Sequence, residues 1–358
     1  MISTGEAILA GSAPSAPVVL STRVRLARNI AGHSFPGWAN PAEKAALLED
    51  ISGAVLPLEA LEGAALLRMA DISDNDRMVL VESHLISREL MKAREGSGAI
   101  IDVASGLSIM INEEDHLRIQ MVRGGLELDS LWKGVDALDS AMEGRLDYAF
   151  SKEIGYLTAC PTNLGTGMRA SVMLHLPGLV LDGHMEQAIR MMNQVGMTVR
   201  GHLGEGSDAT GSIFQVSNQQ TLGEDEATIL RRLRNVVDAV IEQEINARFK
   251  LLEEKGDKLL DKIGRARGIL QNGHLLSSEE AMDLLSLVRL AVDTGMLPEV
   301  WRPKVDALFI ASQPGHMQVR CGKEMNPAQR DAARAKIMRE EFAEMPTLTH
   351  SINNGSAG

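Results

Sequence analysis

Alternating hydrophobic and polar residues predict two strands in the first half of the chain. In segment 117–122 the residues 117, 119 and 121 are apolar and point one way, whereas His116, Arg118 and Gln120 point the other, as a half-buried strand requires. Segment 169–176 repeats the arrangement, with Arg169 and His175 on the side opposite its apolar set. Each predicted strand therefore presents one arginine on its polar side.

Helical periodicity dominates the second half. Apolar residues recur every three or four positions from Ile229 to Ile245, and strand signals fade after Gly223. A capping box beginning at Ser277 opens a further helix, which we expect to stop at Gly295. This half is predicted to be all-helical.

These patterns divide the chain into four parts. Residues 1–17 are rich in Gly, Ala, Ser and Pro, and predict a flexible leader. Strands and helices mix over 18–247, and a helical domain follows over 248–346, so we place the domain boundary at the end of the long helix near residue 247. The polar, Gly- and Ser-containing segment 347–358 predicts a disordered tail.

Composition excludes several classes of protein. The chain has 36 basic and 48 acidic residues, a net charge of 36 − 48 = −12, which argues against a general binder of nucleic acid or of anionic membranes. Any anion site must therefore be a local basic cluster. Cys160 and Cys321, the two cysteines, are far apart, so neither a disulfide framework nor a cysteine-rich zinc site is expected, and a reducing cytoplasm fits best. No stretch approaches membrane-spanning length.

Segment Ser21–Arg28 concentrates arginine in an extended pattern. Alternation places Arg23 and Arg25 on one face, where forked guanidiniums could grip successive phosphate groups. An exposed basic strand without a ligand is the alternative interpretation.

Segment Asn112–Arg118 contains three adjacent carboxylates followed by His116 and Arg118. A solvated turn is one interpretation. The other gives one carboxylate the role of a base or a cation holder and gives Arg118 a phosphate.

Segment Cys160–Ala170 contains the pattern G-x-G-x-x-A, beginning at Gly165, that is found in dinucleotide-binding proteins. Such a site needs a buried strand before the glycines and a helix after them. Here Pro161 precedes and an alternating strand follows, so we reject a dinucleotide site. Cys160 is either a buried structural thiol or, with Arg169 nearby, a thiolate of lowered pKa.

The loop Arg200–Gly206 follows a short predicted strand at 197–199. Its glycines would let the backbone approach a ligand, and Arg200 and Glu205 offer opposite charges. A surface loop with an internal ion pair is the alternative. The sequence has no Walker A motif, no zinc-ligand spacing and no nucleophile elbow.

Arginines on the predicted strands and loops suggest a cradle for a polyphosphate, made of Arg23, Arg25, Arg118, Arg169 and Arg200. The segments Ser21–Arg28, Asn112–Arg118 and Cys160–Ala170 closely resemble the three signature segments of phosphagen (guanidino) kinases. Residues 200–205, 214–219 and 221–223 resemble the protein arginine kinase (McsB) branch of that family. The resemblance spans residues 18 to 340. It implies an α+β fold, in which a catalytic domain with an antiparallel sheet flanked by helices precedes a helical C-terminal domain.

Two departures from the kinases of free guanidino metabolites favour the protein arginine kinase branch. The first arginine motif is reached by residue 23, which leaves no room for the N-terminal helical domain of those enzymes. The helical C-terminal domain instead resembles a dimerisation and substrate-recruiting domain. Within it, Arg330, Asp331, Arg334 and Ala335 match the RDxxRA element, which the resemblance implies to bind phosphoarginine and regulate the kinase allosterically. Spacing alone indicates a solvated i,i+4 pair of arginines.

Matching positions carry the family's site residues onto this chain. The residues implied to bind ATP are Ser21, Thr22, Arg23, Val24, Arg25, His84, Arg118, Arg169, Ala170, Ser171, Val172, Met173, Arg200, Gly201, His202, Leu203, Gly204 and Glu205. Glu114 and Glu205 match the carboxylates that hold and deprotonate the guanidinium, and Cys160 matches the active-site cysteine. No residue is assigned to a metal.

The chemistry explains these residue types. A guanidinium is protonated at any working pH, so a carboxylate, which we assign to Glu114, must take its proton as the nitrogen attacks the γ-phosphorus. A second carboxylate, Glu205, would fix the planar group, and a thiolate at Cys160 would polarise it without a covalent intermediate. The arginines and Mg²⁺, held mainly by phosphates and water, would stabilise the transferring phosphoryl group.

The sequence therefore predicts an ATP-dependent kinase of arginine side chains in proteins. The resemblance implies a cytoplasmic homodimer that marks substrates with exposed arginines for a Clp-type unfoldase and protease, works with an activator protein and regulates a stress response. A kinase of a free guanidino metabolite and a non-catalytic phosphoarginine-binding adaptor are the alternatives. Partners of nucleic acid or membrane type are not expected.

Overall fold

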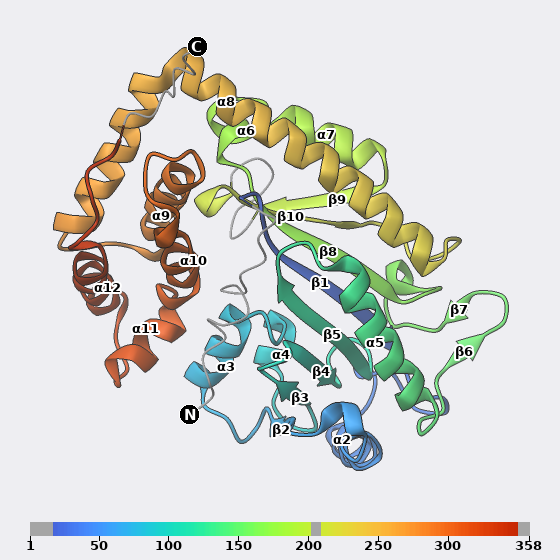
Figure 1. Ribbon diagram of the computed structural model, residues 1–358. Coiled ribbons are helices and arrows are strands. Elements are labelled where there is room, and N and C mark those ends of the chain that lie inside the picture. Colours follow the sequence, from blue (N-terminus) through green and yellow to red (C-terminus); the bar gives the residue numbers. More distant parts are fainter. Residues whose placement is uncertain (1–16, 202–208, 350–358) are drawn as a thin grey trace. The chain divides into compact units, whose positions relative to one another are not determined.

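The computed structural model describes residues 17–201 and 209–349, and they fall into two compact units, each of which is described by itself (Figure 1). The first unit contains residues 17–173, 194–198 and 216–237. The second contains residues 174–193, 199–201, 209–215 and 238–349. The predicted leader over 1–17 and tail over 347–358 lie almost wholly outside the described residues.

Eight strands in the described residues form one sheet. Across the sheet they are β2 (Ala65–Arg68), β3 (Gly98–Asp102), β4 (Leu107–Ile111), β5 (Leu117–Gly124), β1 (Val19–Arg28), β8 (Met168–His175), β10 (Ile213–Asn218) and β9 (Met197–Gly201). From β2 to β1 every neighbouring pair is antiparallel. The strands predicted at 117–122 and 169–176 are confirmed, and so is the α+β class with an antiparallel sheet.

Helices in the first unit cover this sheet and connect its strands. They are α2 (Pro41–Val55), α3 (Asp74–Glu82), α4 (Arg88–Lys92) and α5 (Leu128–Glu143), with the short turns η1 (Glu59–Leu61) and η2 (Pro161–Asn163). In α5 the buried apolar residues recur every three or four positions: Leu128, Leu131, Val135, Leu138 and Met142. That stripe packs against β1 and β5, so α5 supports the strand pair that carries most of the arginines. A two-stranded ribbon, β6 (Phe150–Ser151) and β7 (Gly155–Tyr156), leads toward Cys160.

The second unit is mainly helical. Its helices and turns are α6 (Pro177–Leu181), most of α7 (Met185–Gln194), η3 (Thr210–Ser212), α9 (Ser278–Asp293), η4 (Glu299–Trp301), α10 (Arg302–Ala311), α11 (Pro314–Cys321) and α12 (Pro327–Phe342). The predicted start of α9 is confirmed, because the Ser277 side chain accepts a hydrogen bond from the Glu280 N–H at 3.1 Å. The helix stops before Gly295, whose φ of 75° ends it as predicted.

The helix α8 (Glu226–Asn272) corrects one expectation from the sequence. It does not end near Ala247 but continues to Asn272, and leaves helical geometry only locally at Lys255, where φ is −135°. The reason is that buried apolar residues continue at helical spacing through Leu259, Ile263 and Leu270. Although α8 has 47 residues, neither it nor any other helix of the described residues is apolar enough over a sufficient length to cross a membrane.

Candidate active site

Strand parity and strand pairing bring four arginines, the arginine cradle, to one region of the sheet. Arg23 and Arg25 are two positions apart on β1 and so share a face. In the antiparallel pair of β1 and β5, Ala27 stands opposite Arg118, which places Arg118 on the face of Arg23 and Arg25. Arg169 comes from β8, the neighbour of β1 on its other side. The sequence predicted these four residues as members of one cluster.

The guanidiniums of the cradle repel one another. Burial, together with Arg118 and Arg169, lowers the pKa of Arg23 to about 10. Burial and the same neighbours, with Arg23 added, lower the pKa of Arg25 well below its usual range, and Glu113 acts in the opposite direction. At neutral pH Arg23 is still protonated, so positive charge is concentrated here and an anion would stabilise it.

A cavity of about 150 Å³ adjoins the cradle. Its charged and polar walls are Arg25, Glu114, Arg118, Cys160, Thr162, Asn163 and Arg169. Candidate residues from three separate segments of the sequence therefore meet around one cavity. Thr162 and Asn163 were not predicted from the sequence as site residues, although their position within three residues of Cys160 was a signal for them.

The acidic loop between β4 and β5 is compact. Asn112 has a φ of 57°, and its N–H donates to the carbonyl of His116 at 3.0 Å. The Glu113 side chain is 2% exposed, with its carboxylate 2.8 Å from Nη1 of Arg118. Asp115 is also buried. The interpretation as a solvated turn is therefore wrong for these two carboxylates, which are held inside the protein.

Glu114 is the carboxylate of this loop that lines the cavity. Its side chain is 45% exposed and lies 3.6 Å from Nη2 of Arg118. Burial and then the neighbouring Asp115 raise its pKa, against the opposing effect of Arg118. A carboxylate with a raised pKa is a stronger base than an ordinary one, which suits proton abstraction.

Cys160 lies on the cavity wall at the start of η2. Its Sγ is 3.0 Å from Oγ1 of Thr162, and the hydroxyl of Thr158 donates to its carbonyl at 2.8 Å. The thiol is only half-buried. It is therefore accessible from the cavity, and the interpretation as a wholly buried structural cysteine is wrong.

The glycines after Cys160 serve close packing of the backbone. Gly167 has a φ of 64°, and a Cβ there would come within 2.6 Å of the carbonyl oxygen of Ala27. The Ala27 N–H in turn donates to the carbonyl of Gly167 at 2.9 Å. A strand and not a helix follows, as the rejection of a dinucleotide site requires.

Other residues implied to bind ATP are placed away from the cavity wall. Ser21, Thr22 and Val24 are buried, as are Ala170, Ser171 and Val172, while Met173 is half-buried. The hydroxyl of Thr22 donates to the carbonyl of Gly125 at 2.6 Å, which ties the start of β1 to the turn after β5. Any contact of these residues with ATP stays a prediction.

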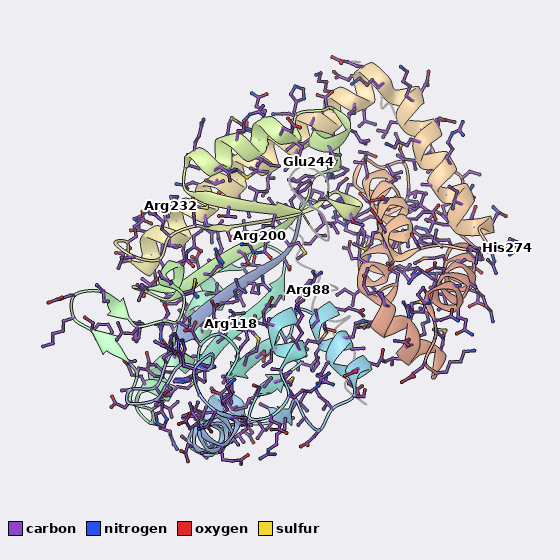
Figure 2. The ribbon with its side chains drawn as sticks, turned by 180° about the vertical axis from the view of Figure 1, so that it is seen from behind. Arg88, Arg118, Arg200, Arg232, Glu244 and His274 are labelled. Carbon is purple, nitrogen blue, oxygen red and sulfur yellow. The ribbon has the colours of Figure 1, made fainter. Side chains whose placement is uncertain are left out.

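The remaining ATP-binding candidates are His84, Arg200 and the loop after it. His84 has a φ of 59°, and its carbonyl accepts a hydrogen bond from Nε2 of Gln120 on β5 at 2.9 Å. Arg200 is exposed and Gly201 half-buried on β9, and both belong to the second unit (Figure 2). His202, Leu203, Gly204 and Glu205 lie outside the described residues.

The RDxxRA element lies on α12. Arg334 is 1% exposed, and it donates to the carbonyls of Ser312 at 2.7 Å and Leu276 at 2.6 Å, and to Asp331 at 2.7 Å. Arg330 donates to the carbonyl of Met325 at 2.7 Å. The expectation of a solvated pair, drawn from spacing alone, is therefore wrong for Arg334. Phosphoarginine binding by this element, including the buried Ala335, stays a prediction.

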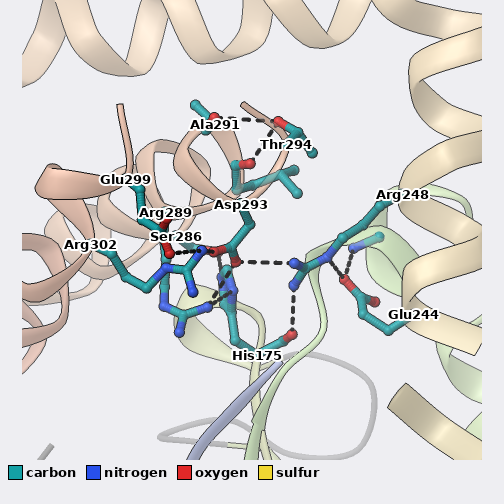
Figure 3. A network of polar contacts seen from close by, with 12 residues as sticks. His175, Glu244, Arg248, Ser286, Arg289, Ala291, Asp293, Thr294, Glu299 and Arg302 are labelled. Carbon is teal, nitrogen blue, oxygen red and sulfur yellow. Dashed lines mark hydrogen bonds and ion pairs between the residues drawn. The ribbon is translucent and has the colours of Figure 1, made fainter. Parts of the chain in front are cut away.

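A second group of arginines, the Asp293 network, lies inside the second unit (Figure 3). Arg248, Arg289 and Arg302 all contact the fully buried carboxylate of Asp293, at 3.0, 2.9 and 2.9 Å. Arg289 also pairs with Asp306 at 2.6 Å. These guanidiniums are neutralised by carboxylates of the protein itself.

His175, at the end of β8, belongs to this network and is completely buried. Nη1 of Arg289 lies 3.2 Å from its Nδ1, and because a guanidinium only donates, Nδ1 must accept. Nε2 therefore carries the proton and donates to Oγ of Ser286 at 2.8 Å. Burial, followed by Arg289 and Arg248, lowers the pKa of His175 well below its usual range, so the ring is neutral.

The carboxylates of the described residues are not gathered into a metal site. In the part of the chain that the structure describes, no three His, Cys, Asp or Glu side chains converge as metal ligands. The carboxylates nearest the cavity instead face arginine: Glu113 and Glu114 both contact Arg118. A metal that reaches this site would have to bring most of its ligands with it.

Family models match two consecutive regions. Residues 48–247 match the model of the ATP:guanido phosphotransferase C-terminal catalytic domain. Residues 256–353 match the model of the protein-arginine kinase McsB C-terminal domain. The two matches leave 248–255 between them, the stretch of α8 that ends at Lys255.

Individual proteins show the same likeness. The chain is 42% identical to a protein-arginine kinase of Halothermothrix orenii over 92% of its own length and 95% of that protein. It is also 42% identical to a protein-arginine kinase of Symbiobacterium thermophilum, over 93% of this chain and 95% of that one. Among solved structures, a lombricine kinase superposes with a TM-score of 0.56 and 25% identity, covering 66% of this chain and 67% of the other.

Proposed function

The chain belongs to the ATP:guanido phosphotransferases, and within them to the protein-arginine kinases, and from that premise we propose that it phosphorylates arginine side chains in proteins. The γ-phosphoryl group of ATP is transferred to a guanidinium nitrogen. An N–P bond forms, the bond from the γ-phosphorus to the bridging oxygen breaks, and ADP leaves.

One observation carries this proposal: the arginine cradle meets a base and a thiol at one cavity. Arg25, Arg118 and Arg169 line it together with Glu114 and Cys160. Burial, and then repulsion between the arginines, lowers the pKa of Arg23 and Arg25, so guanidinium charge is concentrated beside this cavity. A polyphosphate bound there would reduce that repulsion, and Glu114 offers a carboxylate to a guanidinium substrate.

The residues of the site have separate roles in the transfer. The arginines orient the phosphates and stabilise the charge on the transferring phosphoryl group. Glu114 takes the proton that the attacking nitrogen must lose, for which its raised pKa suits it. Arg118, in contact with both Glu113 and Glu114, keeps the base next to the phosphate site.

Two further roles rest on the family. Cys160, as a thiolate, would polarise the bound guanidinium, and Glu205 would fix its plane. Mg²⁺ would be held by the phosphate oxygens of ATP and by water, and when bound it neutralises part of the phosphate charge.

The test compares two acceptors. The purified protein is incubated with Mg-ATP and either free arginine or an unfolded arginine-containing protein, and acid-labile phosphoramidate is scored at neutral or basic pH. We expect label on the protein acceptor only, and its loss by about 10²- to 10⁴-fold in Glu114→Gln. Label on free arginine alone would make the chain a metabolite kinase, and wild type as silent as the variant would make it a phosphoarginine-binding adaptor.

Family membership also supports proposals about cellular context. We place the protein in the cytoplasm as a homodimer that works with an activator protein and marks substrates for a Clp-type protease in a stress response. The McsB C-terminal domain match over 256–353 supports the dimer and the recruitment of substrates. Sedimentation of the purified chain, and degradation assays with and without ATP, test these proposals.

A further inference from the structure

Asn29 is a buried side chain that joins three separate segments of the chain. It directly follows β1 and is 1% exposed. Its Nδ2 donates to Oδ1 of Asp115 at 2.7 Å and to the carbonyl of Leu157 at 2.9 Å. Its Oδ1 accepts from the N–H of His116 at 2.9 Å. Both donors and the acceptor of this amide are therefore used.

Each segment held by Asn29 carries a residue of the cavity wall close by. Asp115 directly follows Glu114, the proposed base. Asp115 also accepts from the N–H of Ala159 at 2.7 Å, and Ala159 directly precedes Cys160. The hydrogen bonds of Asn29 and Asp115 thus connect the strand of Arg23 and Arg25 to the base and to the thiol.

Only an amide satisfies this position. An aspartate at 29 would keep the acceptor for the His116 N–H but lose both donors, and would set a second carboxylate against Asp115. An alanine would leave the buried Asp115 carboxylate and the Leu157 carbonyl each without one partner. In either case the loop with Glu114 and the loop with Cys160 lose their common anchor.

We propose that Asn29 is a positioning residue for phosphoryl transfer, which acts through Asp115 to hold Glu114 and Cys160 in register with the arginine cradle. The inference rests on the proposed function, because it assigns Asn29 to that reaction. Asn29 itself does not touch substrate. Its effect is therefore on how often the base and thiol are correctly placed, and not on the binding of ATP by the arginines.

The kinetic test is Asn29→Ala, assayed with Mg-ATP and an unfolded protein acceptor. We expect kcat to fall by about a hundredfold, the effect of a misplacement of roughly 1 Å, while KM for ATP stays within about threefold. The matched control is Asn40→Ala, which removes a helix-capping asparagine of the first unit that lies off the cavity wall. It should leave kcat unchanged. A kcat for Asn29→Ala within threefold of wild type would overturn the proposal.

A rescue experiment separates positioning from general loss of structure. Asn29→Asp should lose activity, because two carboxylates face each other. Adding Asp115→Asn restores a donor and an acceptor between positions 29 and 115, so the double variant should recover at least about tenfold in kcat over Asn29→Asp. A kcat of the double variant no higher than that of Asn29→Asp would contradict the positioning role.

The accessibility of the Cys160 thiol reports on the role of Asn29 without a measurement of activity. The rate of alkylation of Cys160 by iodoacetamide, followed by peptide mass spectrometry, should change several-fold in Asn29→Ala, while that of Cys321 stays at the wild-type rate. An unchanged rate at Cys160 contradicts the positioning role. If wild type labels no arginine at all, the proposed function fails, whereas the alkylation rates still report whether Asn29 positions the thiol.

Discussion

The arginine cradle of the first unit and the Asp293 network of the second use the same side chain in opposite ways. In the cradle, Glu113 is the main carboxylate that Arg118 contacts, and the pKa of Arg23 is lowered to about 10 by burial and by other arginines. In the network, burial alone would lower the pKa of Arg289, but Asp306 and Asp293 raise it above its ordinary value. Neighbouring arginines thus lower the pKa of the cradle guanidiniums, whereas neighbouring carboxylates raise the pKa of Arg289, and only the first arrangement favours the binding of a further anion.

The difference also separates stability from function. A buried ion pair is costly to break because its partner stays behind as an uncompensated charge. A cluster of like charges is costly to keep, and its members are retained for what they bind. Changes in the network should therefore affect unfolding, and changes in the cradle should affect turnover.

Arg289→Ala should give the largest effect on stability. It leaves the fully buried carboxylate of Asp293 and the half-buried one of Asp306 with fewer partners. We therefore expect a loss of about 3–5 kcal/mol in the free energy of unfolding, measured by urea titration with circular dichroism. The control Arg265→Ala breaks an exposed pair with Asp261 and should give no measurable change. Equal urea midpoints for Arg289→Ala and Arg265→Ala would show that the Asp293 network stabilises the protein no more than an exposed ion pair does.

Arg25→Ala should show the opposite behaviour. Loss of one cradle guanidinium is expected to lower kcat by about 10²- to 10³-fold, while the unfolding midpoint stays level or rises because like-charge repulsion falls. Arg123→Ala is the matched control, since Arg123 is exposed on β5 and stands opposite Thr22, on the other face of the same strand pair. A lower midpoint without kinetic loss in Arg25→Ala would assign the cradle to structure.

His175→Gln should change how the free energy of unfolding depends on pH, because His175 belongs to the Asp293 network. His175 is neutral in the folded protein because its pKa is lowered, whereas the unfolded chain takes up a proton near pH 6.5. Stability is therefore lost as pH falls through that value, by at most about 1.4 kcal/mol per pH unit. Glutamine keeps a donor for Ser286 and an acceptor for Arg289 but does not titrate. Unfolding curves between pH 7.5 and 5 should converge for the two proteins, and parallel curves would contradict the neutral ring.

Asp115→Asn should cause the smallest change, a displacement of the pH profile. Burial and the Asp115 charge raise the pKa of Glu114, and the base works only when ionised, so kcat rises with pH as Glu114 loses its proton. Removal of the Asp115 charge lowers that pKa and moves the acid limb to lower pH, while Arg118, Glu113 and Glu89 still act on Glu114. ADP release measured by chromatography from pH 5 to 8 would reveal it. If the acid limb of the kcat profile does not move, a group other than Glu114 controls it.

The sequence predicted the cradle because local rules are enough to place it. Arg23 and Arg25 share a face through a period of two, and a single register between β1 and β5 adds Arg118. The burial of the polar residues on β8 could not be predicted in this way. His175 was expected on the polar side of the strand but is completely buried, because Ser286 and Arg289 on a helix of the second unit bind its ring. Burial of that kind depends on tertiary packing, and the alternation of residues along one strand carries no information about it.

Two other limits have similar causes. The spacing of Arg334 to Arg330 predicted an exposed side chain. Arg334 is buried instead, because the carbonyls of Ser312 and Leu276, far away in sequence, accept its hydrogen bonds. The end of α8 was misplaced because its apolar spacing continues past Ala247. In both cases the pattern around the residue was correct, and the deciding contact was remote.

The two-residue period of β1 also limits how this part of the gene can vary. One codon gained or lost between Arg25 and Arg28 would shift the register by one residue and turn every side chain on one side of the change to the opposite face of the sheet. Arg28, which now pairs with Asp139 at 2.6 Å, would then lie on the same face as the cradle arginines. The length of this segment is therefore more constrained than the identity of the residues between its arginines, and descendants of this gene should keep the spacing of Arg23, Arg25 and Arg28.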